Sequence, residues 1–536
     1  MRFKALLFVL FLSGLWPISA SARNRFIVRY TAGLSDLKEA CEKLDCTVVS
    51  NVDGDQNEIF LLTASSKINP SDLVAKLLHT HGVTSAELDQ AVALDRGLNQ
   101  ATAIPAGLLD TRPVQYFGSS VWHGYVDQPA AEIVRVSRAQ SKFHVDGTGV
   151  IVADIGTGVD PNHPALQGVL LPGWDFTRNL QGGWETRDFE PGFSPPPCPE
   201  CPVAIVNQST AAVLDQSTAA LLGGNSEYAA FGHGTMVMGI IHLVAPQAML
   251  LPLKAFHADG TAFLSDILSA IYFAVANQAK VINMSFDLEA NSPQLTHALD
   301  FARRRNVICT ASVGNDGQMV VVYPAALQGD VMGVASTNNL DQRSTFSNFG
   351  DAIVWVAAPG ESVISTFPFG TFGASWGTSF SAPFVAGAAA LLLNQRPDTN
   401  ESQAAAALAH AVPIGPNMGN GRVDLVQALA ANSALGPDFN LAESDQPNTQ
   451  IHRGEEGTFT FNVEALQGFT GTVDVTVEGL PSKASADIDP RVITGAGGFE
   501  LTLEVDEDTP PGLYPLTITG RSGSLLHSVF ILLQVR

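Results

Sequence analysis

The sequence predicts an α/β protein: a parallel sheet with helices on both faces, preceded by a small α+β unit and followed by an all-β sandwich. Three observations predict it. From about residue 147, strand-like and helix-like segments alternate, as in parallel sheets with crossover helices. A shorter unit with two strand-like and two helix-like segments comes before them. After residue 438, apolar and polar residues alternate in short segments separated by turns, which is typical of antiparallel sandwiches.

The composition is that of a globular protein of several domains. Its 536 residues suit about three domains of ordinary size. Hydrophobic residues make up 46% and charged residues 15% of the chain, which excludes a disordered protein. The net charge of −23 argues against nucleic acid or an anionic membrane as a partner, because both require a basic surface.

Residues 1–22 resemble a secretory signal. Arg2 and Lys4 precede the apolar run Ala5–Leu12, and small residues at 20–22 form a cleavage site. A single membrane anchor is the alternative, but the apolar run is short for a membrane span. We therefore expect a secreted protein, either extracellular or periplasmic.

Residues 23–96 form the small α+β unit. Residues 26–30 and 58–62 alternate like strands, and residues 34–44 and 70–79 have helical spacing. On this pattern alone, the unit can be an unrelated α+β module. Residues 97–139 show no strong period and are interpreted as a linker with an N-terminal extension.

The central region carries the parallel sheet. Its expected strands and helices lie at residues 150–153, 251–256, 264–277, 281–286, 294–304 and 307–313. Ligands in such sheets bind at the carboxyl ends of the strands. Residues 170–230 exceed what this core needs, so we expect them to be a surface insertion near a substrate cleft.

Ser379 begins the most informative stretch of the chain. It follows a Gly-Thr turn, and the apolar run after Pro383 predicts a helix that is buried all round. A serine at a helix N-terminus is usually a capping residue. There the helix dipole and free N–H groups also favour developing negative charge, so a serine beside a base can act as a nucleophile.

The whole string G-T-S-F-S-A-P-F-V-A-G, residues 377–387, closely resembles the nucleophile segment of the subtilisin-like serine proteases. The resemblance extends over about residues 140–432 and implies a peptidase domain there. It implies that residues 23–96 are an inhibitory propeptide, that polypeptides are the substrates, and that Ser379 is the nucleophile. The segment G-H-G-T at 232–235 is similar to the family's base segment and implies that His233 is the catalytic base.

Two further segments match the family. Gly314-Asn315 resembles its oxyanion segment, which implies that the Asn315 amide stabilises the tetrahedral intermediate. A plain turn after a strand is the alternative. Ser285-Phe286-Asp287 resembles the segment S-x-G that lines the substrate site, so Ser285, Asp287 and Gly314 are expected to bind substrate. Asp287 stands where the family has glycine, which alters the charge of the primary pocket.

The acid of the expected triad is displaced. The family has V-A-V-I-D-T-G where this chain has V-A-D-I-G-T-G, so Gly156 occupies the usual position of the acid and Asp154 stands two residues earlier. Side chains two apart on a strand share a face, about 6.6 Å apart. Asp154 either takes over the role through the space left by Gly156, or does so after a strand slip with a bulge at Ile155-Gly156. Otherwise the acid is lost, and the chain is a catalytically impaired subtilisin-like pseudoprotease acting as a binding or scaffold protein.

No cofactor is expected to be required. Calcium is common in the family, but no carboxylate cluster here matches a family calcium site, so a structural calcium ion stays open and unplaced. Residues 436–536 are expected to form the sandwich, which is immunoglobulin-like in architecture and carries no catalytic constellation.

The five cysteines receive separate predictions. Cys198 and Cys201 form a C-x-x-C pair, which can be half a zinc site, a redox pair or a short disulfide loop. Export favours oxidation, so we expect a disulfide there. Cys309 lies in an apolar strand and is expected to be a buried free thiol, and Cys41 is expected to pair with Cys46.

Overall fold

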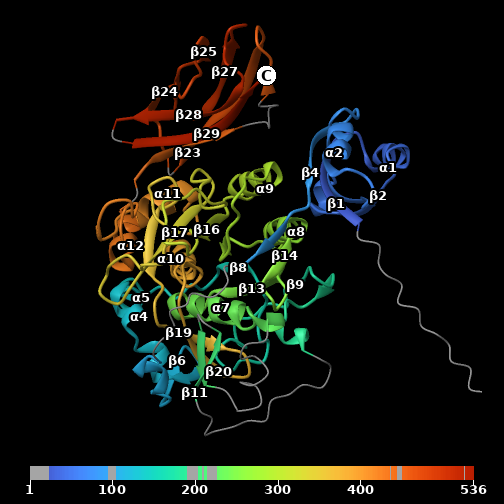
Figure 1. Cartoon of the computed structure of the whole chain (residues 1–536). Helices are drawn as coiled ribbons and strands as arrows, with labels where there is room; N and C mark the ends of the chain where they lie inside the picture. The colour runs from blue at the N-terminus through green and yellow to red at the C-terminus, as the bar shows by residue number, and fades with distance from the viewer. Residues whose placement is uncertain are drawn as a thin grey trace, which may run out of the picture. The chain divides into compact units, whose positions relative to one another are not determined.

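The computed structural model describes residues 23–94, 104–189, 203–207, 210–213, 226–434, 436–443, 450–466, 468–523 and 525–536 (Figure 1). The signal-like residues 1–22 and the pair Cys198 and Cys201 lie outside the described residues, and their predictions stay predictions. The chain divides into two compact units, of which the first ends at Asp89 and the second begins at Gln90.

The first unit is the predicted small α+β fold. Its antiparallel sheet has the order β2-β3-β1-β4 and carries two helices. The elements are β1 (Arg23–Tyr30), α1 (Leu34–Lys43), β2 (Cys46–Asn51), η1 (Gly54–Gln56), β3 (Ile59–Ser65), α2 (Pro70–Leu78) and β4 (Val83–Leu88). The side chain of Asn69 accepts hydrogen bonds from the amides of Ser71 and Asp72, and Pro70 occupies the first turn, so α2 begins where the sequence indicates.

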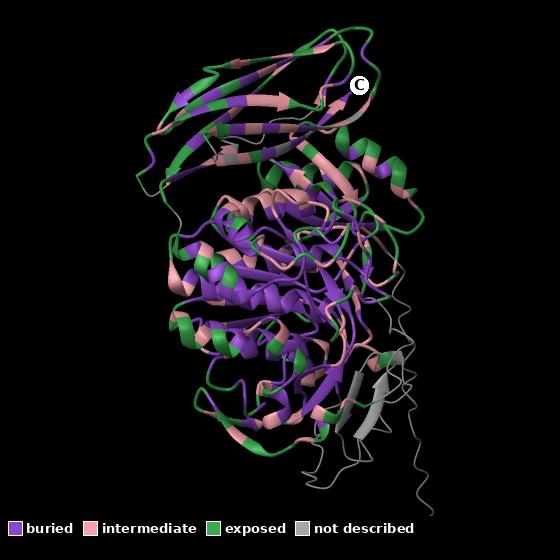
Figure 2. Cartoon of the chain, turned by 90° about the vertical axis from the view of Figure 1, so that its left-hand side faces the viewer, coloured by how far each residue is buried: buried purple, intermediate pink, exposed green. Residues whose placement is uncertain are grey.

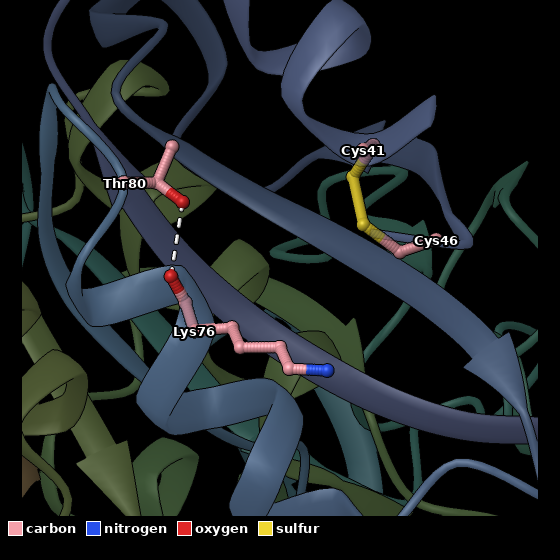
Figure 3. The surroundings of a disulfide bond; sticks show 4 residues. All are labelled: Cys41, Cys46, Lys76 and Thr80. Atoms are coloured by element: carbon pink, nitrogen blue, oxygen red, sulfur yellow. Dashed lines mark hydrogen bonds between the residues drawn. A yellow bond between two sulfur atoms is a disulfide. The ribbon is translucent and has the colours of Figure 1, made fainter. Parts of the chain in front are cut away.

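A disulfide joins Cys41 on α1 to Cys46 at the start of β2, which confirms that predicted pair (Figure 3). It closes the tight connection between the helix and the strand. The same view shows the end of α2, where the Thr80 hydroxyl donates to the carbonyl oxygen of Lys76 at 3.0 Å. Thus two of the helix–strand connections of this unit have a fixing contact of their own.

The second unit contains the predicted parallel sheet, with the order β10-β9-β13-β8-β15-β16-β17-β18. Only the pairing of β10 with β9 is antiparallel. The strands are β8 (Ile151–Gly156), β9 (Trp174–Asp175), β10 (Leu180–Gln181), β13 (Met249–Lys254), β15 (Val281–Met284), β16 (Ile308–Ser312), β17 (Met332–Thr337) and β18 (Val356–Pro359). The register of β8 runs unbroken against β13 from Ile151 to Gly156. The bulge at Ile155-Gly156 that the sequence left open is therefore wrong, because both residues pair regularly.

Helices pack on both faces of this sheet. α7 (His233–Val244) and α10 (Ala382–Gln395) pack against each other and against β8, while α8 (Leu264–Ala276) and α9 (Pro293–Arg303) pack together and contact β13 and β16. Every residue of α7 after His233 is buried, and α10 is buried from Ala382 to Leu393. Figure 2 shows that many of the buried residues lie in the region of this sheet and its helices. Helices that are apolar all round can be stable only inside a core, as the sequence predicted.

Residues 104–143 are more ordered than a linker. They form η2 (Ala106–Leu109), β6 (Pro113–Tyr116), β7 (Ser119–Trp122), α3 (His123–Val126), α4 (Pro129–Ile133) and α5 (Val136–Phe143). Buried residues of this stretch, such as Leu108 and Tyr125, belong to the core around α7 and α10. The sequence showed no period here because most of these elements are only four or five residues long, which is shorter than a periodic pattern requires.

The remaining elements of the peptidase-like region lie around the sheet. They are β5 (Ala91–Ala93), η3 (Glu185–Asp188), β11 (Val203–Asn207), β12 (Thr210–Val213), η4 (Ser226–Tyr228), β14 (Thr261–Phe263), β19 (Val363–Phe367), β20 (Thr371–Ser375), η5 (Thr378–Phe380), α11 (Glu401–Leu408) and α12 (Leu425–Ser433). The described part of the insertion pairs β12 with β20, the strand that leads to Ser379.

The last region is the predicted antiparallel sandwich. One sheet has the order β21-β23-β27-β25 and the other β22-β29-β28-β24-β26. The strands are β21 (Asp438–Glu443), β22 (Gln450–Ile451), β23 (Glu456–Leu466), β24 (Thr472–Glu478), β25 (Ala484–Asp489), β26 (Val492–Thr494), β27 (Gly497–Val505), β28 (Gly512–Ser522) and β29 (Leu525–Val535). Inward residues of both sheets, among them Phe461 and Leu516, share one apolar core. Within the described ranges, no helix has the length and hydropathy required to cross a membrane.

Candidate active site

Ser379 lies on a turn between β20 and α10. Gly377 has φ 147°, a conformation that favours glycine, and the turn η5 leads through Ser381 into α10. The Ser379 hydroxyl donates to the carbonyl oxygen of Ser285 at 3.1 Å, and the Ser285 hydroxyl donates back to the carbonyl oxygen of Ser379 at 2.8 Å. These two contacts fix the position of Ser379, which is 8% exposed.

Asn315 lies beside this turn. Its side-chain Oδ1 accepts hydrogen bonds from the Thr378 amide at 2.8 Å and from the Thr378 hydroxyl at 3.0 Å. This fixes the plane of the amide. A Cβ added to Gly377 would stand 3.6 Å from Asn315 Nδ2, so this N–H donor also lies against the Ser379 turn. The structure thus brings the predicted nucleophile and the predicted oxyanion donor together.

His233 is the first residue of α7. Gly232 precedes it with φ 89°, which again favours glycine. The ring of His233 packs against the ring of Phe380, the residue after Ser379, with centroids 5.3 Å apart. The predicted base is therefore adjacent to the nucleophile turn. Its Nδ1 is buried and has no hydrogen-bond partner among the described residues.

The start of α7 is held by a buried carboxyl that the sequence did not indicate. Glu185 Oε2 accepts from the Gly232 amide at 2.9 Å and from the Thr157 hydroxyl at 3.1 Å. Its Oε1 accepts from the Thr235 amide at 3.2 Å and also from the Thr235 hydroxyl. A carboxyl at a helix N-terminus satisfies N–H groups that have no partner within the helix. Glu185 therefore positions the backbone on both sides of His233.

Asp154 lies at the centre of the sheet with 2% exposure. Its Oδ1 accepts a hydrogen bond from Asn283 Nδ2 at 2.8 Å, whereas its Oδ2 has no partner among the described residues. A Cβ added to Gly156 would meet that Oδ2 at 3.0 Å and the Cα of Gly234 at 3.9 Å. The carboxyl of Asp154 therefore leans toward Gly156, and Gly156 faces the residue after His233.

Asn283 connects Asp154 to the nucleophile side. It is fully buried in β15, and its Nδ2 donates to Asp154 Oδ1 and to the Ser285 hydroxyl, the latter at 2.9 Å. Because Ser285 bonds Ser379, a hydrogen-bonded chain runs from Asp154 to the nucleophile. The only sequence signal for Asn283 was a polar residue inside an apolar strand. Glu185 gave no signal, because it lies in the long region before the base segment.

Burial shifts the protonation of these groups. Burial raises the pKa of the Asp154 carboxyl to about 7, and the charge of Glu185 adds to this while the Asn283 hydrogen bond opposes it. Burial also raises the pKa of Glu185 to about 7. Burial lowers the pKa of His233 to about 4. A histidine with so low a pKa is a weak base unless a carboxylate stabilises its charged form.

The three residues predicted to bind substrate lie next to one another. Ser285 bonds Ser379, and Asp287 follows two residues later. Gly314 has φ 88°, and a Cβ added to it would stand 3.2 Å from Asp287 Oδ2. The described ranges contain no cluster of three or more His, Cys, Asp or Glu side chains that could hold a metal ion. Cys309 is a buried free thiol, as predicted.

Comparison with known proteins shows which family of proteins the chain is similar to. A sequence model described as "Subtilase family" matches residues 147–446. Thermitase from Thermoactinomyces vulgaris is 30% identical over 271 residues, which are 51% of this chain and 84% of thermitase. Subtilisin E from Bacillus subtilis (strain 168) is 32% identical over 266 residues, which are 48% of this chain and 58% of subtilisin E. A thermophilic serine proteinase from Bacillus sp. (strain AK1) is 30% identical over 248 residues, which are 46% of this chain and 53% of that proteinase.

Proposed function

The chain belongs to the subtilase family, and on that premise we propose that it is a secreted serine endopeptidase acting through an acyl-enzyme. Ser379 attacks the peptide carbonyl. His233 takes the proton of Ser379 and gives it to the leaving amine. Asn315 Nδ2 and the backbone N–H of Ser379 hold the oxyanion.

One observation carries this proposal: Asn315 and Ser285 both bond the short turn that presents Ser379. The first contact leaves the Asn315 N–H groups available for the oxyanion. The second contact is the hydrogen bond from the Ser379 hydroxyl to the carbonyl oxygen of Ser285. The hydroxyl breaks this bond when it gives its proton to His233. Catalytic hydrogen bonds are often incomplete before substrate binds, so the Ser285 contact is compatible with a nucleophile at rest.

We assign to Asp154 the role of the triad acid, which orients His233 and stabilises its charged form. The Oδ2 of Asp154 and the Nδ1 of His233 are both buried and have no hydrogen-bond partner within the described ranges, and an unpartnered buried polar atom is costly. The space left by Gly156 lies between Asp154 Oδ2 and Gly234, the neighbour of His233. Asp154 therefore stabilises the charged imidazole across this space, directly or through a water molecule.

The chain also supplies its own inhibitor, in this proposal. In the second unit, β5 pairs antiparallel with β14, and the amide of Leu94 donates to the Gly260 carbonyl oxygen at 2.8 Å. The loop at Gly260 adjoins Ala230, whose carbonyl oxygen accepts from the His233 amide. A segment added as a strand beside the base occupies the place of a peptide substrate. This supports residues 23–96 as an inhibitory propeptide.

A pseudoprotease is the second candidate. The observation that favours it is that His233 Nδ1 has no partner in the described part of the chain, because a base without an orienting acid loses most of its catalytic power. Such a protein would use the same fold for binding or as a scaffold. The polar residues around Ser379 would then not catalyse peptide hydrolysis.

A fluorophosphonate probe together with N-terminal sequencing separates the two candidates. We expect the probe to label wild-type protein at Ser379, and the secreted protein to begin between residues 96 and 140. A secreted protein that begins near Arg23 and takes up no probe would instead establish the pseudoprotease. A protein with Ser379→Ala serves as the labelling control.

A further inference from the structure

Asp287 is an acidic side chain at the carboxyl end of β15, where the catalytic groups gather. It is partly buried, and its Oδ2 stands 3.2 Å from the position that a Cβ on Gly314 would occupy. Gly314 immediately precedes Asn315, and Ser285, two residues before Asp287, is bonded to Ser379. The carboxyl of Asp287 therefore lies beside the segment that carries Asn315, and Asp287 is two residues from Ser285, which bonds Ser379.

The proposed function places a peptide substrate close to this carboxyl. In the proposed reaction the scissile carbonyl carbon approaches Ser379 Oγ, and the carbonyl oxygen approaches Asn315 Nδ2. The side chain of the residue before the scissile bond branches from the next atom, so it begins within a few ångströms of both groups. Gly314 contributes no side chain there; a Cβ on it would meet Asn348 Nδ2 at 2.6 Å and Asp287 Oδ2 at 3.2 Å.

A second carboxylate adds to the negative charge beside this position. Asn348 Nδ2, the atom nearest to the added Cβ, donates to Asp316 Oδ2 at 3.2 Å, and Asp316 follows Asn315 directly. Negative charge close to a developing oxyanion raises the energy of the transition state. A cationic substrate side chain placed between them offsets that repulsion and pairs with the carboxylate.

We propose that Asp287 makes this endopeptidase prefer lysine or arginine immediately before the scissile bond. The inference rests on the proposed function, because it takes Ser379 and Asn315 as the reacting groups. It adds a substrate class that a glycine at position 287 would not select. The selection acts in the transition state as well as in binding, so it affects kcat as well as KM.

The test compares peptide substrates that differ only before the scissile bond. The pair is lysine and norleucine, which have nearly the same shape but differ in charge, with glutamate as a third member. For the processed wild-type enzyme we expect kcat/KM for lysine to exceed that for norleucine by about tenfold or more, and glutamate to be the poorest. The advantage of lysine should shrink as ionic strength rises.

Variants assign the preference to Asp287. Asp287→Asn should lower the lysine-to-norleucine ratio most of the way toward one, with Asp316 retaining a smaller part of the preference, and should raise kcat/KM for the glutamate substrate. Asp287→Gly should lower the same ratio, which shows that the effect comes from losing the carboxylate and not from the asparagine side chain. Glu289→Gln is the matched control, because it removes the same charge from an exposed position two residues away. It should leave the ratio unchanged.

Two results would overturn the inference while leaving the endopeptidase intact: no lysine preference in an active wild type, or a preference that is undiminished in Asp287→Asn. If the protein neither takes up the fluorophosphonate probe nor cleaves any substrate, the proposed function itself fails. Calorimetry with product peptides ending in lysine or norleucine then tests Asp287 alone. Equal binding of the two peptides, or no binding of either, would refute the charge preference.

Discussion

The turn that carries Ser379 and the strand end that carries Asp154 differ in how completely their polar groups are partnered. At the turn, the Ser379 hydroxyl and carbonyl both bond Ser285, and Asn315 accepts two hydrogen bonds from Thr378. On the acid side, Asp154 Oδ2 is buried without a partner among the described residues, and so is Nδ1 of the proposed base, His233.

The difference shows which catalytic groups the fold holds in place in the absence of substrate. The nucleophile and the oxyanion donor are held in place before substrate arrives, which is the usual source of electrostatic preorganisation. The acid side keeps a space at Gly156 instead of a carboxylate. Substitutions on the two sides should therefore have unequal effects.

The largest effect is expected on the nucleophile side. Ser379→Ala should abolish peptidase activity, by roughly 10⁶-fold, because the bond-forming atom is gone. It should also stop removal of the propeptide. Peptide hydrolysis and the N-terminus of purified, protease-free protein measure both effects. An alanine variant that still processes itself would show that Ser379 is not the nucleophile.

Asp154→Asn tests the acid side and should lower kcat by about 10³–10⁴-fold, since the charged form of His233 loses its counter-charge. KM should change little because Asp154 has only 2% exposure. Adding Gly156→Asp to this variant should restore part of the rate. The Cβ of the new aspartate would lie 3.0 Å from the atom at the position of Asp154 Oδ2, and the amide that Asp154→Asn introduces tolerates a neighbouring carboxylate better than the original carboxyl does. Unchanged turnover in a folded Asp154→Asn protein would remove Asp154 from the mechanism.

Glu185→Gln should have a smaller effect, about tenfold on kcat. The amide keeps one acceptor oxygen but turns N–H groups toward the donors of Gly232 or Thr235, so the start of α7 shifts. Asp188→Asn is the matched control. Asp188 lies in η3 with Glu185 and pairs with Lys254 and Arg178, and none of the described hydrogen bonds joins its side chain to α7. Thermal unfolding should report a loss in both variants, whereas kcat should fall only in Glu185→Gln. Equal kcat losses would contradict a positioning role.

The last prediction concerns stability and does not depend on catalysis. Burial raises the pKa of Asp154 to about 7, above its ordinary 3.8, so between those values the folded protein holds a proton that the unfolded chain has lost. The stability that this group contributes is therefore present at low pH and is lost as pH rises toward 7, by about 1.4 kcal/mol per unit. Chemical denaturation should show Asp154→Asn gaining stability over wild type from pH 5 to pH 7. A pH-independent difference would mean that Asp154 is ionised throughout.

The sequence by itself determined the local parts of this protein. The apolar run after Pro383 required a buried helix, and the alternation after residue 438 required an antiparallel sandwich, because each pattern has only one way to bury its apolar residues. The motifs around Ser379, His233 and Asn315 are contiguous, so their resemblance to a family could be found without coordinates. Elements of four or five residues, such as α3 and β6, gave no pattern to detect.

Only the tertiary structure decided which distant groups meet. Asn283 joins Asp154 to Ser285 because parallel strands β8 and β15 place residues 154 and 283 side by side. Glu185 reaches α7 from nearly fifty residues earlier, as its hydrogen bonds to Gly232 and Thr235 show. Neither contact follows from a local pattern, since hydrogen bonds between distant segments depend on strand register and chain path. For the same physical reason, the sequence could identify Asp154 as displaced but could not show that its free oxygen leans into the space left by Gly156.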